Sequence, residues 1–334
     1  MRALTASSRL LARASGAVGS PHAAAGAVDR GRAAPANRPA PGWQVWTGLG
    51  IVYVVWGSTY LAIRVLVETM PPLLSGGVRF MLAGAILYAV LLVRGGREGV
   101  RFTRAQVVSC LVVGSLLVTG GNGMVMVGEV DVPSGLAALI IASVPLWVIV
   151  YRRAAGEAIA AGTLAGVAVG FVGLALLLLP SGGNDEVTSW VGLLLVFLAA
   201  PSWALGSFLS KRRPLPADPF LSTSLQMLLG GATSIVAGVV HGEAGGVDFG
   251  SFSSDSLIAF AYLVVVGSLV AFSAYVWLLQ HAPISKVATY AYVNPVIAIF
   301  LGWAILSEEI TASIVAGAVV VVASVATIVR KESS

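Results

Sequence analysis

Residues 112–116 read Val-Val-Gly-Ser-Leu, and the same five letters return at residues 265–269. Further matches flank this pentapeptide in the same order, at an offset that drifts only from 147 to 153. The matched positions are Trp56, Pro72, Leu74, Ser75, Leu82, Gly84 and Ala85 with Trp203, Pro219, Leu221, Ser222, Leu229, Gly231 and Ala232, then Pro133, Pro145, Glu157, Ala165 and Gly166 with Pro283, Pro295, Glu308, Ala316 and Gly317. Chance does not supply collinear blocks, so the chain contains two copies of one unit.

The composition predicts a membrane protein. Apolar residues make up 57% of the chain, charged residues only 10%, and the mean hydropathy is +0.91, whereas a soluble domain carries about 25% charged residues. The single cysteine, Cys110, lies in an apolar run, which excludes a disulfide framework and a cysteine-based metal site. A net charge of +5 is compatible with nucleic-acid binding, but the placement of the cations argues against such a partner.

Ten stretches are long and apolar enough to cross a bilayer, which takes about 20 helical residues each. They are residues 47–67, 73–93, 107–128, 134–151, 161–180, 189–210, 219–240, 256–279, 284–305 and 311–329. Helices are expected because backbone amides in lipid must be satisfied without water. The fold class predicted is therefore an all-α polytopic membrane protein, with loops too short for a soluble domain.

The charges alternate between the loops. Every Lys and Arg except Arg64 and Arg79 falls in the first tail, the even-numbered loops or the C-terminus, while the odd-numbered loops carry acids such as Glu129 and Glu308. By the positive-inside rule, both termini are cytoplasmic.

Each copy contains five predicted spans, which is an odd number, so the copies should lie in opposite orientations in the membrane. The two five-helix repeats cover residues 47–180 and 189–330. Inverted repeats give a protein two near-equivalent ways to open around a site at the midplane, which is the basis of alternating access. Channels also use inverted repeats, so the pattern favours transport more strongly than it favours a carrier.

Several motifs resemble a known family. They are Trp56-Gly57-Ser58-Thr59-Tyr60 with Arg64, Pro71-Pro72 followed by Arg79-Phe80, and Tyr292-Val293-Asn294-Pro295-Val296-Ile297-Ala298 followed by Gly302-Trp303 and Glu308. Over residues 45–330 the chain resembles the EamA-type transporters of the drug/metabolite transporter superfamily. The resemblance implies a ten-helix secondary carrier that moves small metabolites, commonly outward. Gln226 stands at the position equivalent to Arg79, and Lys211 at that equivalent to Arg64, so identical binding chemistry in the two halves is not expected.

Polar groups inside spans are candidates for substrate contact because a bilayer penalises them. Arg79 is the strongest, with snorkelling to the surface or clamping of carbonyls as the structural alternatives. Arg64 is weaker because Glu68, one turn later, explains it as an i,i+4 pair. Asn122 lies in a glycine-rich segment, and its alternative role is an interhelical hydrogen bond.

Aromatic and hydroxyl groups complete the predicted binding wall, since Tyr and Trp combine a flat apolar face with a polar edge. Tyr290 and Tyr292 cannot both face one cavity, because two helical residues differ by about 200°. Proline marks helix kinks or gates in the fourth and ninth spans, at Pro145 and Pro295. Besides Arg79 and Asn122, the predicted binding residues are Trp56, Ser58, Thr59, Tyr60, Trp147, Trp203, Gln226, Tyr275, Tyr290 and Asn294.

The charges inside the predicted spans bear on the substrate. No Asp or Glu lies in the middle of a span, which disfavours an obligatory carboxylate-driven drug/proton antiporter. The only deep charge is cationic, which favours substrates that bear a carboxylate, such as amino acids. A proton-coupled multidrug exporter is the alternative.

Other function classes find little support. The chain has no GxxxxGK[ST] phosphate loop, and His22, His241 and His281 are scattered. We therefore predict no cofactor, no metal and no catalytic residue. A membrane-embedded lipid-modifying enzyme and a non-transporting scaffold are the rival classes. The partners expected are a small-molecule substrate and the lipid bilayer, and the oligomeric state is not predicted.

The first 46 residues are rich in Arg, Ala, Gly and Pro and contain one acid, Asp29. They are predicted to be a disordered basic cytoplasmic tail, with an organellar transit peptide as the alternative. The Ala, Gly, Val and Arg bias favours the inner membrane of a bacterium.

Overall fold

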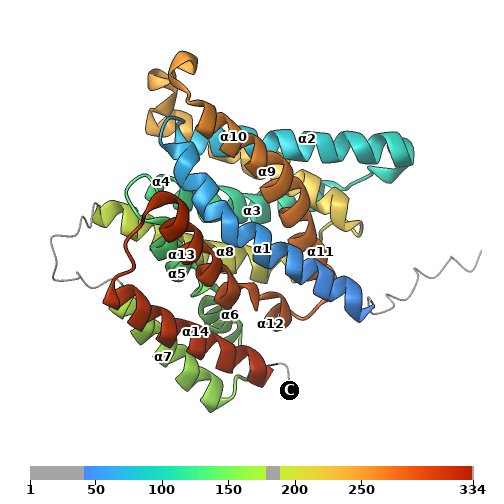
Figure 1. The fold of residues 1–334 in the computed structure, drawn as a ribbon. Helices are drawn as coiled ribbons and strands as arrows, with labels where there is room; N and C mark the ends of the chain where they lie inside the picture. Colours follow the sequence, from blue (N-terminus) through green and yellow to red (C-terminus); the bar gives the residue numbers. More distant parts are fainter. Residues whose placement is uncertain (1–40, 178–188, 333–334) are drawn as a thin grey trace, which may run out of the picture. The chain divides into compact units, whose positions relative to one another are not determined.

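The computed structural model describes residues 41–177 and 189–332, and every regular element within those ranges is helical (Figure 1). Seven helical segments are long and apolar enough to cross a membrane: Gly42–Val67, Pro72–Gly96, Arg104–Gly128, Ser134–Ala154, Trp190–Ser210, Pro219–His241 and Ser254–His281. Three shorter apolar stretches, Ala161–Gly173, Val293–Leu306 and Ile314–Ser324, fall where further spans were predicted. The all-helical membrane class is confirmed, and the count of ten spans stays a prediction.

The first half of the chain, residues 41–177, contains α1 (Gly42–Val67), α2 (Pro72–Gly99), α3 (Arg104–Gly114), the π-helix η1 (Ser115–Gly123), α4 (Met124–Gly128), α5 (Ser134–Ile141), α6 (Val144–Ala154) and α7 (Ala161–Leu177). The second half, residues 189–332, contains α8 (Trp190–Ser210), α9 (Pro219–His241), the 3₁₀ turns η2 (Glu243–Gly246) and η3 (Phe249–Ser251), α10 (Ser254–Tyr262), the π-helix η4 (Leu263–Phe272), α11 (Ser273–His281), α12 (Ile284–Val287), α13 (Tyr290–Leu306) and α14 (Ala312–Glu332). Both π-helices lie in the third predicted span of their half and overlap at repeat-equivalent positions. A π-turn widens the helix locally and is common at functional sites.

Two predictions fall partly beyond these ranges. The tail up to residue 40 and residues 178–180 of the predicted fifth span lie outside the described part of the chain. Residues 42–46, assigned to the tail from the sequence, are the first turn of α1.

Local sequence explains where the helices begin. Pro72 occupies the first turn of α2, where its missing N–H costs nothing. Thr103 and Gln106 form a reciprocal capping box at the start of α3. At α9 the Asp218 side chain accepts from the amides of Phe220 and Leu221.

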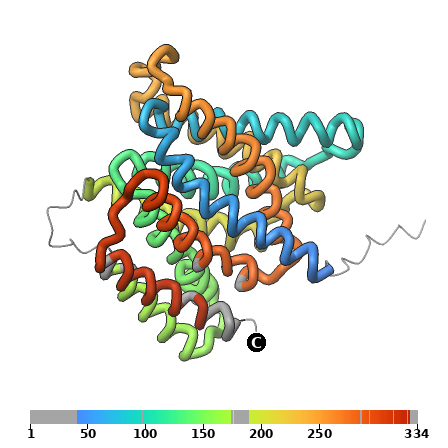
Figure 2. The backbone as a smooth tube through the Cα atoms, in the orientation of Figure 1, coloured from blue at the N-terminus to red at the C-terminus, as the bar shows by residue number. Residues whose placement is uncertain are grey.

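The packing of helices has the same pattern in the two halves. The repeat-equivalent helices α2 and α9 pack on each other, and so do α7 and α14, which run side by side in Figure 1. The first helix of each half packs against the other half. Helix α1 packs against η4, α10, α11 and α13 of the second half, which Figure 2 shows as blue beside orange and red. Helix α8 packs against η1, α4, α5 and α6 of the first half.

Glycines allow the close contact between α2 and α9. A Cβ on Gly77 would lie 2.8 Å from the backbone oxygen of Gly231, and one on Gly231 would lie 2.7 Å from the backbone oxygen of Gly77. Without a hydrophobic driving force between helices in lipid, small residues at such crossings supply the packing energy.

Two acids of the second half cap helices of the first half. The Glu243 carboxylate accepts from the backbone amides of Leu73 (3.1 Å) and Leu74 (2.8 Å) at the start of α2. The Glu308 carboxylate accepts from the Ser134 amide (2.9 Å), the Ser134 hydroxyl (2.9 Å) and the Gly135 amide (3.2 Å) at the start of α5. Both satisfy amides that have no partner within their own helix, and both place a negative charge at a positive helix end.

Candidate substrate cavity

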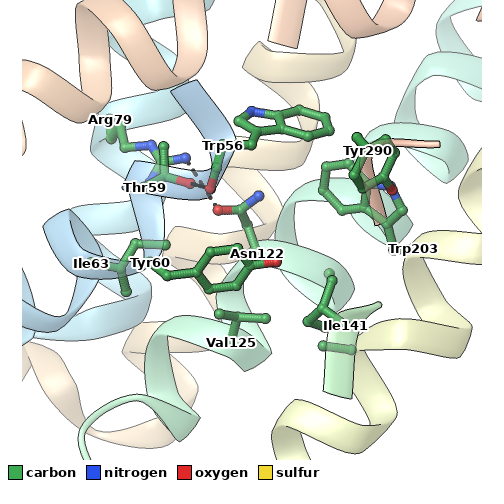
Figure 3. A pocket seen from close by; sticks show the side chains of 12 residues that line it. Trp56, Thr59, Tyr60, Ile63, Arg79, Asn122, Val125, Ile141, Trp203 and Tyr290 are labelled. Carbon is green, nitrogen blue, oxygen red and sulfur yellow. Dashed lines mark hydrogen bonds between the residues drawn. The ribbon is translucent and has the colours of Figure 1, made fainter. Parts of the chain in front are cut away.

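A cavity of about 50 Å³ lies between helices of both halves (Figure 3). Its lining comes from α1, α2, η1, α4 and α5 of the first half and from α8 and α13 of the second. The lining residues are Trp56, Thr59, Tyr60, Ile63, Arg79, Gly121, Asn122, Val125, Ile141, Ala199, Trp203 and Tyr290.

One wall is a single stripe of α1. Trp56, Thr59, Tyr60 and Ile63 recur at intervals of three and four residues, which puts them on one face of a helix. All four are buried. Three residues of the first-helix motif identified in the sequence, Trp56, Thr59 and Tyr60, therefore lie on one continuous surface.

Aromatic rings form a second wall. Trp56 and Trp203, which are repeat-equivalent positions, meet with ring centroids 5.2 Å apart at 86°, and Tyr290 meets Trp56 edge to face at 5.4 Å. Tyr275 lies behind this wall, with its ring centroid 4.8 Å from that of Trp56. Its hydroxyl accepts a hydrogen bond from Trp203 Nε1 (3.1 Å) and forms another with Ser207 Oγ (2.6 Å). Edge-to-face pairs of this kind stabilise the wall beyond the apolar area they bury.

Among the described residues, Arg79 is the only cation that lines this cavity. Its side chain is 2% exposed; Nε donates to Ser268 Oγ of η4 at 2.9 Å, and Nη2 donates to Asn122 Oδ1 of η1 at 3.1 Å. The remaining nitrogen, Nη1, is buried and has no hydrogen-bond partner within residues 41–177 and 189–332. The guanidinium thus links both π-helices and keeps one pair of N–H donors free. Its burial argues against snorkelling to the surface.

Glycine brings the third predicted span close to α8. A Cβ on Gly121 would lie 2.5 Å from Cε3 of the Trp203 ring, so only glycine leaves Trp203 in its position beside the cavity. Gly120 is equally constrained by Ser202. The glycine-rich segment around Asn122 therefore serves close packing.

The structure brings together seven of the twelve binding residues predicted from the sequence: Trp56, Thr59, Tyr60, Arg79, Asn122, Trp203 and Tyr290. The other five do not line the cavity. Tyr275 supports the aromatic wall from behind. Ser58 contacts the Tyr262 hydroxyl at 2.6 Å beside an apolar groove, and Trp147 packs on Phe171 and Phe197.

Gln226 and Asn294 are buried in contacts of their own. Gln226 Nε2 donates to Ser222 Oγ at 2.8 Å within α9. With its side-chain amide in the orientation that satisfies both of its ends, Asn294 donates from Nδ2 to the backbone oxygens of Tyr53 (3.1 Å) and Tyr290 (3.3 Å). The side chain of Tyr292 lies outside the described part of the chain.

The two prolines differ in their surroundings. Pro145 lies in the first turn of α6, just after the break at residues 142–143, whereas Pro295 lies inside α13, after the break at residues 288–289. Both predicted spans are thus interrupted, each by a break that precedes its proline.

Arg64 does not form the i,i+4 pair with Glu68 that the sequence suggested. Its guanidinium donates instead to the backbone carbonyls of Glu129 and Val130, and no ion pair to Glu68 is present in the described ranges. The prediction was wrong because carbonyls exposed where α4 ends compete for the same donor.

Five lining residues escaped the sequence analysis: Ile63, Gly121, Val125, Ile141 and Ala199. Helical spacing from Tyr60 and Asn122 could have identified Ile63 and Val125. Ile141 and Ala199 carry no signal, since apolar residues in apolar spans look alike.

Residues 45–179 and 190–330 each match the EamA-like transporter family. The chain belongs to this family. It is 36% identical over 261 residues to the "Uncharacterized inner membrane transporter YedA" of Escherichia coli K12, covering 78% of this chain and 82% of the relative. It is also 26% identical over 296 residues to the "Probable amino-acid metabolite efflux pump" of Salmonella typhimurium, covering 82% of this chain and 90% of that protein.

One crystal structure superposes with a TM-score of 0.61 at 18% identity, over 87% of this chain and 99% of the other. At that identity the likeness concerns the fold alone. The two family matches follow the two sequence copies, and the family is one of transporters rather than of enzymes. The protein is thus a multi-pass membrane transporter.

Proposed function

We propose that this protein is a secondary transporter that exports amino acids or related amphipathic metabolites across the bacterial inner membrane. The single observation that carries the proposal is the buried Arg79, with Nη1 unpartnered, in a cavity walled by Trp56, Trp203 and Tyr290. A guanidinium binds a carboxylate through strong charge-assisted hydrogen bonds. The aromatic faces suit the apolar side chain of the same molecule.

The charge balance of the cavity supports a carboxylate ligand. A buried cation is costly unless it is paired. In the described part of the chain Arg79 has only neutral partners: the side chains of Ser268 and Asn122, and the Phe80 ring, whose centroid lies 4.4 Å from Cζ. A substrate carboxylate supplies the missing negative charge. A cationic drug brings a second positive charge instead, which disfavours the multidrug exporter.

Transport is proposed to proceed by alternating access between two inverted five-helix repeats, with both termini cytoplasmic. Three features support the repeats: the reciprocal packing of α1 and α8, the meeting of equivalent positions Trp56 and Trp203, and the π-helices in equivalent spans. A site shared by both repeats can be exposed to either side when one repeat rocks against the other.

Counterflow in proteoliposomes tests the proposal. The probes are labelled leucine, phenylalanine, glutamate and lysine, with an amphipathic cationic dye as the competing class. The wild type is expected to show saturable counterflow of at least one amino acid, and Arg79→Gln is expected to lose it. The control variant Arg101→Gln alters an exposed arginine paired with Glu98 and is expected to retain counterflow. Dye transport that survives Arg79→Gln, without amino-acid counterflow, would refute the proposal.

A further inference from the structure

Glu129 is a buried acid whose carboxyl group has no hydrogen-bond partner among the residues that the structure describes. The residue is 0% exposed, and neither Oε1 nor Oε2 forms a hydrogen bond. From the sequence it is a loop acid directly after a span that ends at Gly128. In the fold, Glu129 is the C-cap of α4, and its backbone amide donates to Val125 O at 2.8 Å in the last turn of this helix. Because Val125 lines the cavity, Glu129 lies one turn, about 5 Å, beyond the cavity wall.

The cation that acts on this carboxyl, Arg64, already donates to other groups. Arg64 lies one turn beyond Tyr60, another lining residue. Its guanidinium donates hydrogen bonds to the backbone carbonyls of Glu129 and Val130. It does not pair with the Glu129 side chain. The carboxyl therefore lacks both a counterion in contact and a hydrogen-bond donor.

Few other titratable groups face Glu129. From α1 these are Arg64 and the Tyr60 phenol, and from the segment after α13 it is Glu308. Two residues that pack on α4 just before Glu129 do not titrate: Val196 of α8 lies against Gly128, and Gly76 of α2 lies against Met126.

A carboxylate in such a site is unstable unless it takes up a proton, since burial without compensation penalises the charged form most. Burial raises the pKa of the Glu129 carboxyl well above its usual range, and the negative charge of Glu308 raises it further, while Arg64 acts in the opposite direction. The neutral acid is therefore the form compatible with this conformation.

We propose that Glu129 is the proton-binding site of this transporter and that its protonation is coupled to the contact between Glu308 and the start of α5. The inference rests on the proposed transport function and adds its coupling ion. The Glu308 carboxylate joins the second half to Ser134 and Gly135 of the first. When Glu129 releases its proton to water, a second negative charge appears next to Glu308 and opposes that contact. Proton release and separation of the two halves thus favour each other, as linkage requires.

Infrared spectroscopy of the purified full-length protein tests the proton site without any substrate. The wild type is expected to show the carbonyl stretch of a protonated carboxyl at neutral pH, and Glu129→Gln to lack it. The matched control, Glu68→Gln, removes an exposed acid of a neighbouring loop and should keep the band. Absence of the band from the wild type would overturn the proposal, even if Glu129→Gln did not fold.

Transport provides the second readout, with the amino acid that the counterflow panel selects as the probe. In wild-type vesicles a pH gradient, acidic inside, is expected to drive uptake. In Glu129→Gln that uptake should fall to the level without a gradient, while counterflow, which needs no net proton movement, continues. Gradient-driven uptake that survives in Glu129→Gln would refute the coupling.

The two proposals fail in different ways. A protonated Glu129 without amino-acid counterflow leaves the proton site standing and refutes the substrate class. Counterflow that responds neither to the pH gradient nor to Glu129→Gln refutes the proton site and leaves the substrate class standing.

Discussion

Replacing Arg79 by Met would remove the guanidinium and keep a side chain of similar length. In the wild type, Nη1 of this buried group is the free donor that the substrate carboxylate is proposed to occupy. A hydrogen bond to a charged group contributes about 1.5–3 kcal/mol. The substitution should therefore weaken carboxylate binding about 10- to 150-fold in Kd.

Tryptophan fluorescence gives a direct assay, because Trp56 and Trp203 form part of the cavity wall. Leucine is titrated against leucinamide, which has the same side chain and no carboxylate. The wild type should prefer leucine by the factor above, and Arg79→Met should bind the two ligands alike. The difference between the two ratios is a coupling energy specific to guanidinium and carboxylate.

A structural role for Arg79 predicts a different result. Its bonds to Asn122 and Ser268 hold the two π-helices together, so their loss alone should weaken both ligands equally. Equal weakening would refute the carboxylate contact. Ser268→Ala, which removes one of these bonds and keeps the charge, should preserve the preference for leucine.

Three further changes test the surroundings of the cavity. Gly121→Ala places a methyl group against Trp203 and should cost about 1–3 kcal/mol, measured as a lower melting temperature together with reduced counterflow. Glu308→Ala removes the cap of α5 and should cost about 1 kcal/mol of stability, seen as faster hydrogen exchange in its first turn. Glu157→Gln should cost at most about 1 kcal/mol, since its ion pairs are partly exposed. Because the hydrogen bond from Arg152 lowers the pKa of Glu157, that stabilisation is present above the pKa of an unfolded Glu and is lost as pH falls through the folded one. The melting temperatures of wild type and Glu157→Gln should thus converge in acid.

Hydropathy identified where the helices lie, because a bilayer demands long apolar runs whatever their packing. The predicted range 134–151 and the observed segment Ser134–Ala154 illustrate this. Hydropathy did not reveal the break at residues 142–143 or the π-turns of η1 and η4. These depend on which carbonyl each amide selects, and apolar side chains carry no information about that choice.

The sequence could predict those lining residues whose polar side chains stand in apolar spans. Arg79 and Asn122 are polar groups in apolar spans, and they lie together as lining residues. Glu129 was interpreted as an ordinary loop acid, because the charged groups that act on it, Arg64 and Glu308, are far from it in the sequence. Sequence order cannot show such convergence without a tertiary structure.

The asymmetry between Arg79 and its repeat-equivalent Gln226 has a physical reason. Gln226 is 1% exposed in α9, away from the cavity lining, and its Oε1 has no partner. An arginine there would be a second buried cation without a substrate carboxylate to neutralise it. Gln226→Arg should therefore lose about 3–5 kcal/mol, the usual cost of an uncompensated buried charge.

Gln226→Met is the matched control, since it removes an unsatisfied polar atom and keeps the volume, and it should be close to neutral. Thermal unfolding of both variants in detergent, followed by tryptophan fluorescence, measures the difference. A Gln226→Arg protein as stable as the wild type would mean that α9 can hydrate or pair a cation at this position. The restriction of the cation to the first half would then have to come from selection at the substrate site rather than from the cost of burial.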